Sequence, residues 1–122
     1  MLFEDFLNRA RNISDDLNVP LNEVYREWRP SEPPKTVMLS ELGHYIVGNI
    51  DRFDPKVCSL LFGLIEEALR GEDAITRDAV ATGLVESLVN ASDGNDKLWC
   101  QIKSCLGPKS LRHAVAWKNF GS

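Results

Sequence analysis

Few residues of this 122-residue chain have the types and spacing that catalysis or metal binding needs. Its two histidines, His44 and His113, belong to no His-Glu-x-x-His zinc motif. Cys100 and Cys105 are five positions apart, whereas zinc and redox motifs place two residues between their cysteines. We therefore expect no catalytic residue, no cofactor site and no metal site.

The adjacent acids Glu66 and Glu67 do not form an acid/base pair either. Neighbouring residues of a helix point about 100° apart, so these carboxylates cannot face one reacting group from opposite sides. The glycines are scattered through expected helices and helix ends, and they form no phosphate-binding loop. The chain is therefore expected not to be an enzyme.

Charge is the more informative feature. Residues 1–96 contain all 18 acids and 9 Lys or Arg, whereas residues 97–122 contain 5 Lys or Arg and no acid. Most of the uncompensated acids fall in residues 66–96, where Arg70 and Arg77 are the only cations. Such asymmetry bears on the choice of partner rather than on the fold.

The acids of this region are carried by a predicted pair of helices at the centre of the chain. Asp54 can cap a helix that begins at Pro55, because the missing proline N–H has no intrahelical role there. This helix is apolar over most of its circumference as far as Leu69, which predicts burial. Gly71 is expected in the left-handed conformation that ends helices, and Thr76 is expected to cap the second helix.

The second helix shows a four-residue apolar repeat at Val80, Leu84 and Leu88, so it is expected to pack antiparallel on the first. The chain is also expected to break at Val19, because a residue before proline avoids the helical region. Gly107 and Pro108 are expected to separate the last two helices. The spacing of apolar residues predicts further helices over residues 1–17, 20–28, 36–49, 96–106 and 108–118.

These elements predict one all-α domain over residues 1–122, a compact bundle of about six helices around a solenoid-like or HEAT-like hairpin. Its parts are the N-terminal helices in residues 1–29, a proline-rich connector in 30–35 and the main helical body in 36–122. The odd cysteine count and the lack of a leader pattern favour a cytoplasmic protein. No apolar run is long enough to span a bilayer.

Two binding classes fit the charge pattern. The basic tail also carries Trp99, Trp117 and Phe120, a composition that single-strand nucleic-acid binding uses. The acidic remainder of the chain would repel phosphate, so this alternative is disfavoured. The second class is a protein-binding module that uses the acidic hairpin.

A resemblance supports the second class. The segments Gly71-Glu72-Asp73, Leu84-Val85-Glu86-Ser87-Leu88 and Leu106-Gly107-Pro108 resemble those of small all-helical bacterial proteins, over residues 54–120. Some of these proteins are immunity proteins of polymorphic or contact-dependent growth-inhibition toxin systems. The resemblance implies one protein partner, a cognate toxin domain.

Many toxin domains of this kind are nucleases with cationic surfaces, which an acidic partner can occupy and block. An exposed tryptophan is expected to anchor the interface. A helical adaptor or regulatory subunit of a bacterial complex is the alternative function. The expected partner-binding residues are the acids Glu66, Glu67, Glu72, Asp73, Asp78 and Glu86 and the aromatics Trp28 and Trp99.

Overall fold

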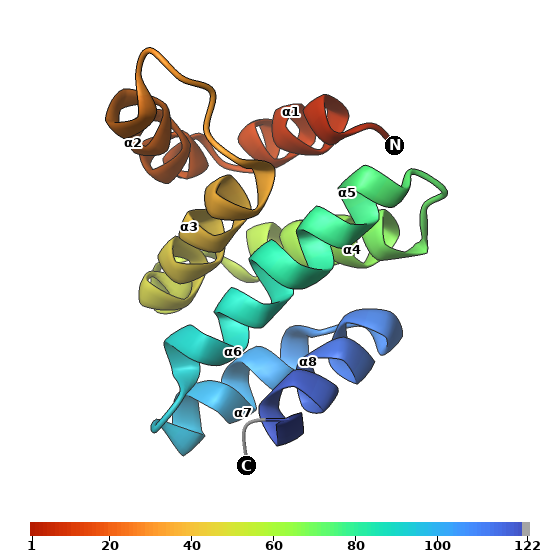
Figure 1. The fold of residues 1–122 in the computed structure, drawn as a ribbon. Coiled ribbons are helices and arrows are strands. Elements are labelled where there is room, and N and C mark those ends of the chain that lie inside the picture. The colour runs from red at the N-terminus through yellow and green to blue at the C-terminus, as the bar shows by residue number, and fades with distance from the viewer. Residues whose placement is uncertain (121–122) are drawn as a thin grey trace.

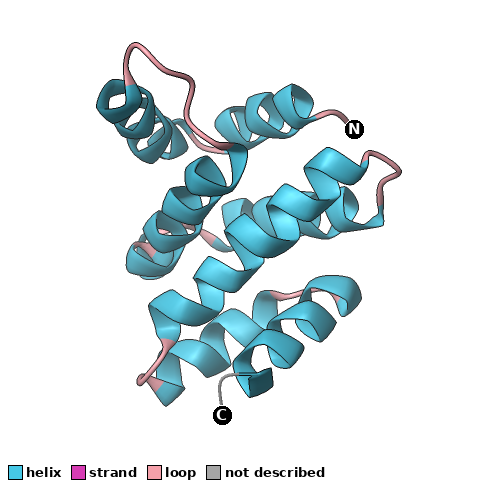
Figure 2. Cartoon of the chain, in the orientation of Figure 1, coloured by secondary structure: helices cyan, strands magenta, loops and turns pink. Residues whose placement is uncertain are grey.

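The computed structural model describes residues 1–120, and all regular structure in that range is helical (Figure 2). The helices are α1 (Phe3–Ile13), α2 (Asn18–Trp28), α3 (Lys35–Gly48), α4 (Pro55–Arg70), α5 (Ala74–Ala79), α6 (Glu86–Ser92), α7 (Asp96–Cys105) and α8 (Pro108–Phe120). A π-helix over Val80–Val85 joins α5 to α6, and 3-10 turns occupy Asp15–Leu17 and Ile50–Arg52. The all-α prediction is confirmed. The solenoid-like character of the central hairpin stays a prediction.

The N-terminal helices are divided at a different residue from the one expected. Ser14 is extended, with φ −152° and ψ 127°, so the predicted helix 1–17 ends at Ile13. The break predicted at Val19 is also wrong, because α2 already begins at Asn18. Pro20 is the third residue of α2, where its missing N–H removes no intrahelical hydrogen bond. α1 packs against α4, and α2 packs against α3 (Figure 1).

The start of α4 is as predicted, but its end is not. The Asp54 side chain accepts a hydrogen bond from the Val57 N–H at 2.9 Å and so caps the helix. Gly71 is extended rather than left-handed, with φ −76° and ψ 168°. The cap of α5 is Asp73, which accepts a bond from the Thr76 N–H at 3.1 Å, so the expected Thr76 cap is wrong. α4 is also less completely buried than expected, since Leu60 is 49% exposed.

The second helix of the predicted hairpin comprises α5, the π-helix and α6, and it packs against α3 more extensively than against α4. Val80, Leu84 and Leu88 are fully buried, as their spacing predicts. Two glycines allow α3 to lie close to the π-helix and to α6. A methyl group at Gly83 would lie 2.9 Å from the Thr36 carbonyl oxygen, and one at Gly43 would overlap the Ser87 hydroxyl.

α7 and α8 close the lower part of the bundle in Figure 1. Asn95 caps α7 by accepting from the Leu98 N–H at 3.0 Å, and α8 begins at Pro108 as predicted. α8 packs against α4 and α6. Buried side chains from Phe3 to Ala114 form one hydrophobic cluster across these helices. In the described part of the chain, no helix combines the length and hydropathy that crossing a membrane needs.

Candidate protein-binding surface

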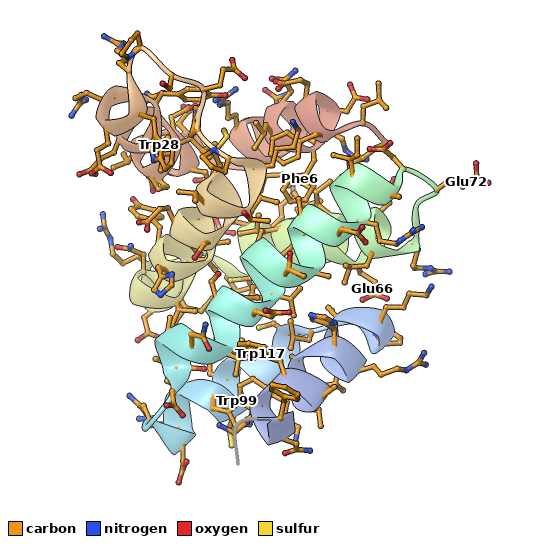
Figure 3. The ribbon with its side chains drawn as sticks, viewed as in Figure 1. Phe6, Trp28, Glu66, Glu72, Trp99 and Trp117 are labelled. Carbon is orange, nitrogen blue, oxygen red and sulfur yellow. The ribbon has the colours of Figure 1, made fainter. Side chains whose placement is uncertain are left out.

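Glu66 was expected on the binding surface, but it is an internal structural residue. Only 8% of it is exposed, and its carboxylate turns toward the start of α8 (Figure 3). It accepts hydrogen bonds from the Lys109 N–H at 2.9 Å, the Ser110 N–H at 3.0 Å and the Ser110 hydroxyl at 2.9 Å. These amides have no partner within α8, so Glu66 completes the helix from a different part of the chain.

The hydrogen bonds also determine the protonation state of Glu66. Burial raises the pKa of its carboxyl, but the bonds from Ser110 and Lys109 outweigh this effect. The net result is a pKa below the ordinary value. Glu66 is therefore ionised at neutral pH although it is buried.

Glu86 is likewise engaged inside the bundle. Its carboxylate lies 2.9 Å from Nε2 of His113 on α8, and its side chain is 17% exposed. One turn further along, Asn90 accepts a hydrogen bond from the Trp117 indole N–H at 2.9 Å. The basic C-terminal helix thus meets the acidic hairpin at Glu66 and Glu86.

The other four expected acids remain at the surface, and they differ in the hydrogen bonds and ion pairs that they make. Glu67 forms an exposed ion pair with Arg9 at 2.6 Å, and the Arg9 hydrogen bond lowers the pKa of its carboxyl. Asp73 is held by its capping role, and its hydrogen bond from the Thr76 hydroxyl lowers its pKa. The carboxylates of Glu72 and Asp78 are exposed and make no hydrogen bond or ion pair within residues 1–120.

The two tryptophans do not join this surface. Trp99 is 9% exposed and packs in the core with the Lys118 ammonium 5.0 Å from its ring centre, so its predicted anchor role is wrong. Trp28 is 38% exposed, but it lies on α2 on the opposite side of the molecule from Glu72 (Figure 3). An interface around Glu72 therefore needs other apolar anchors.

Such anchors are present at the α4–α5 turn, where the sequence analysis missed them. Leu2 is 64% exposed and Ile75 is 61% exposed. The start of α1 adjoins this turn, because a methyl group at Gly71 would lie 3.7 Å from the Met1 nitrogen (Figure 1). The hairpin-tip surface, as we name it, comprises Leu2, Glu4, Asp5, Glu67, Glu72 and Ile75.

Local sequence gave little indication of this surface. Leu2 fits the apolar periodicity of α1, and Ile75 stands in what reads as a short turn. The two residues belong to one region because the start of α1 adjoins the α4–α5 turn. The available signal was a large aliphatic residue within the polar turn Gly71–Ile75.

Neither metal binding nor nucleic-acid stacking has clear support in the described residues. Within residues 1–120, no group of three His, Cys, Asp or Glu side chains is arranged to hold a metal ion. Trp117 is tied to Asn90 and Trp99 is in the core, so Phe120 is the aromatic residue of the basic tail that is largely exposed, at 83%.

The architecture and surface define a compact all-α domain whose acidic, partly apolar tip is available for contact. The model of the family described as "Domain of unknown function (DUF7674)" matches residues 3–121, and the chain belongs to that family. No curated protein and no solved structure matches the chain.

Proposed function

We propose that this protein is a non-catalytic protein-binding module, an immunity protein that neutralises a cognate bacterial toxin domain in the cytoplasm. It would act by stoichiometric binding that blocks the active site or the substrate groove of the toxin. The observation that carries the proposal is the hairpin-tip surface, where exposed Leu2 and Ile75 lie among acids. Buried apolar anchors with a charged rim are the usual composition of a protein interface.

The chemistry of the surface favours a cationic partner. Glu4 and Glu72 are exposed acids of the tip, and neither has an ion-pair partner within residues 1–120. A nuclease needs a cationic groove for phosphate, and an acidic surface can compete for that groove and accelerate encounter.

The first experiment is affinity capture from the lysate of the source cells, at low and moderate salt, with mass spectrometry of the bound proteins. The protein should be immobilised through its C-terminal end, because Met1 adjoins the tip. We expect one stoichiometric partner that carries a toxin domain. The purified partner should lose its activity at a one-to-one ratio.

Three variants then locate the interface. Ile75→Asp should lower the affinity at least 100-fold, because it places a charge where an apolar anchor is buried. Glu72→Lys should slow association about tenfold at low salt and less at high salt. Glu32→Lys is the matched control, since it makes the same charge change at an exposed residue of the connector, and it should leave both properties near wild type.

Two results would overturn the proposal. One is a toxin-free, heterogeneous set of captured proteins that dissociates at moderate salt. The other is a genuine toxin partner whose affinity falls equally in Glu32→Lys and Ile75→Asp, because the tip would then have no special role.

A second surface favours the adaptor alternative. A groove of about 370 Å³ between α2 and α3 is lined by Glu23, Glu27 and Glu41 beside Val19 and Tyr45. It lies away from the hairpin tip, as the positions of α2 and α5 in Figure 1 show. An adaptor needs two such separate contact surfaces. Simultaneous capture of two partners, one released by Ile75→Asp and the other by Glu27→Lys, would favour the adaptor over the immunity protein.

A further inference from the structure

A second groove lies between α8 and the segment formed by α5 and the π-helix, and its charge is opposite to that of the tip. This α5–α8 groove, formed by α5, the π-helix and α8, has a volume of about 540 Å³. Leu69, Ala81 and Ala116 give it an apolar surface, and Arg77, Lys109 and Arg112 bring cations to it. Pockets for small molecules typically measure about 300–1,000 Å³ and combine an apolar lining with a few polar groups.

The cations of the groove have little internal use. Among the described residues, neither the Lys109 ammonium nor the Arg112 guanidinium makes a hydrogen bond or ion pair. Arg77 donates one long hydrogen bond, 3.3 Å, to the Gly71 carbonyl. Asp78 is the acid on the groove lining, so cations outnumber acids there although the whole chain has a net charge of −4.

The groove is distinct from the N-terminus of α8. The first amides of that helix already donate to Glu66, so they are not available to a ligand. The opposite wall includes Ala81 and Thr82 of the π-helix, and single π-helical turns occur frequently at functional sites.

We propose that the α5–α8 groove binds a small amphipathic organic anion, with its apolar body against Leu69, Ala81 and Ala116. Its carboxylate lies between Arg112 and Lys109, within reach of Arg77. The two parts of the lining select the two parts of the ligand, since the apolar wall favours a hydrocarbon body and the guanidinium groups bind carboxylate in a forked geometry. This site does not depend on the proposed protein-binding function of the tip.

Sodium decanoate, below the concentration at which it forms micelles, is the probe. Titration followed by amide chemical shifts should give a dissociation constant on the order of 0.1–1 mM, as expected for a ligand of this size. The shifts should concentrate in residues 77–82 and 109–116. Decanol, inorganic phosphate and decyltrimethylammonium each lack one required property, and each should bind at least tenfold more weakly.

Variants on exposed positions test the groove without disturbing the core. Arg112→Glu should weaken decanoate binding at least tenfold, and Ala116→Trp should weaken it similarly by filling the groove. Asp78→Asn should tighten it two- to threefold by removing the acid. Lys103→Glu, an equal charge change at an exposed residue of α7 outside the groove, should leave binding within twofold of wild type.

The inference would be overturned by equal binding of decanol, by equal binding of phosphate, or by equal loss in Arg112→Glu and Lys103→Glu. Shifts confined to another hollow would also overturn it. If Ala116→Trp proves unfolded by circular dichroism, Arg112→Glu and Asp78→Asn still decide the matter, because their expected effects have opposite signs.

Discussion

Glu66 and Glu67 are adjacent in α4, yet they belong to two different regions of the molecule. Glu66 is in the α4–α8 junction, where three donors from α8 surround its carboxylate. Glu67 belongs to the hairpin-tip surface, where its ion pair with Arg9 is open to water. The first region uses a negative charge to complete the fold, and the second keeps its charges exposed to solvent. An acid-rich sequence therefore does not by itself mark an acidic binding surface.

The largest expected effect is the difference in unfolding free energy between alanine variants of these two glutamates. Glu66→Ala removes the acceptor of three donors, of which the two from Ser110 are buried, so it should lower the free energy of unfolding by about 2–4 kcal/mol. Glu67→Ala should cost less than about 1 kcal/mol, because an exposed ion pair contributes little. Urea unfolding followed by circular dichroism measures both. Similar losses in the two variants would contradict the comparison.

The next effect is the pH dependence of the junction. The folded pKa of Glu66 lies below its ordinary value of 4.5. Its stabilisation is therefore fully present above pH 4.5 and is lost as the pH falls through the folded pKa. The stability difference between wild type and Glu66→Gln should accordingly shrink on acidification.

Glu67 and Asp73 also have lowered pKa values, so they titrate in the same acidic range. They are present in both proteins, and subtracting the two unfolding curves removes their contribution. A wild-type-minus-variant difference that stays constant from pH 7 to about pH 3 would show that the Glu66 carboxylate is not selectively stabilised.

A smaller effect concerns the Arg9–Glu67 pair. A double-mutant cycle with Arg9→Met and Glu67→Gln should give a coupling energy of about 0.2–1 kcal/mol. The coupling should fall as salt rises, because both side chains are about half exposed. A larger, salt-independent coupling would mean that this part of the tip is structural, as the junction is.

The smallest effect is expected at the centre of the tip. Glu72→Gln and Ile75→Ser alter exposed side chains, so each should change the free energy of unfolding by less than about 0.5 kcal/mol. Thermal unfolding checks this expectation. Marked destabilisation by Ile75→Ser would indicate that this residue stabilises the fold, which would contradict its assignment to a binding surface.

The sequence predicted those features of the fold that depend on neighbouring residues. Asp54 with Pro55 marked the start of α4, and the spacing of Val80, Leu84 and Leu88 marked a buried face. Each signal needs only contacts within a turn or two of helix. The cap of α5 is Asp73 rather than Thr76, which agrees with the general preference for Asp over Thr at this position, so this signal was present in the sequence.

The candidate site was harder to predict, because its residues are sorted by contacts distant in sequence. Glu66 is buried by Lys109 and Ser110, more than forty positions away. Trp99 is buried by the packing of the bundle, and Leu2 lies near the α4–α5 turn because α1 packs on α4. Charge counting identified the acidic region, but packing decides which of its acids reach solvent.

The π-helix has a consequence for how the chain tolerates insertions and deletions. One residue added to a regular helix turns everything beyond it by about 100°, and a π-helical turn absorbs such a residue locally. Here that widened turn lies between α5 and the face of α6 where Glu86 and Asn90 meet His113 and Trp117. Deleting the exposed Thr82 should therefore restore a regular helix while Glu86 and Asn90 keep their direction toward α8, whereas a deletion within α6 itself would rotate the residues beyond it. The segment Val80–Val85 is therefore the place where this helix can lose one residue and keep α6 aligned with α8.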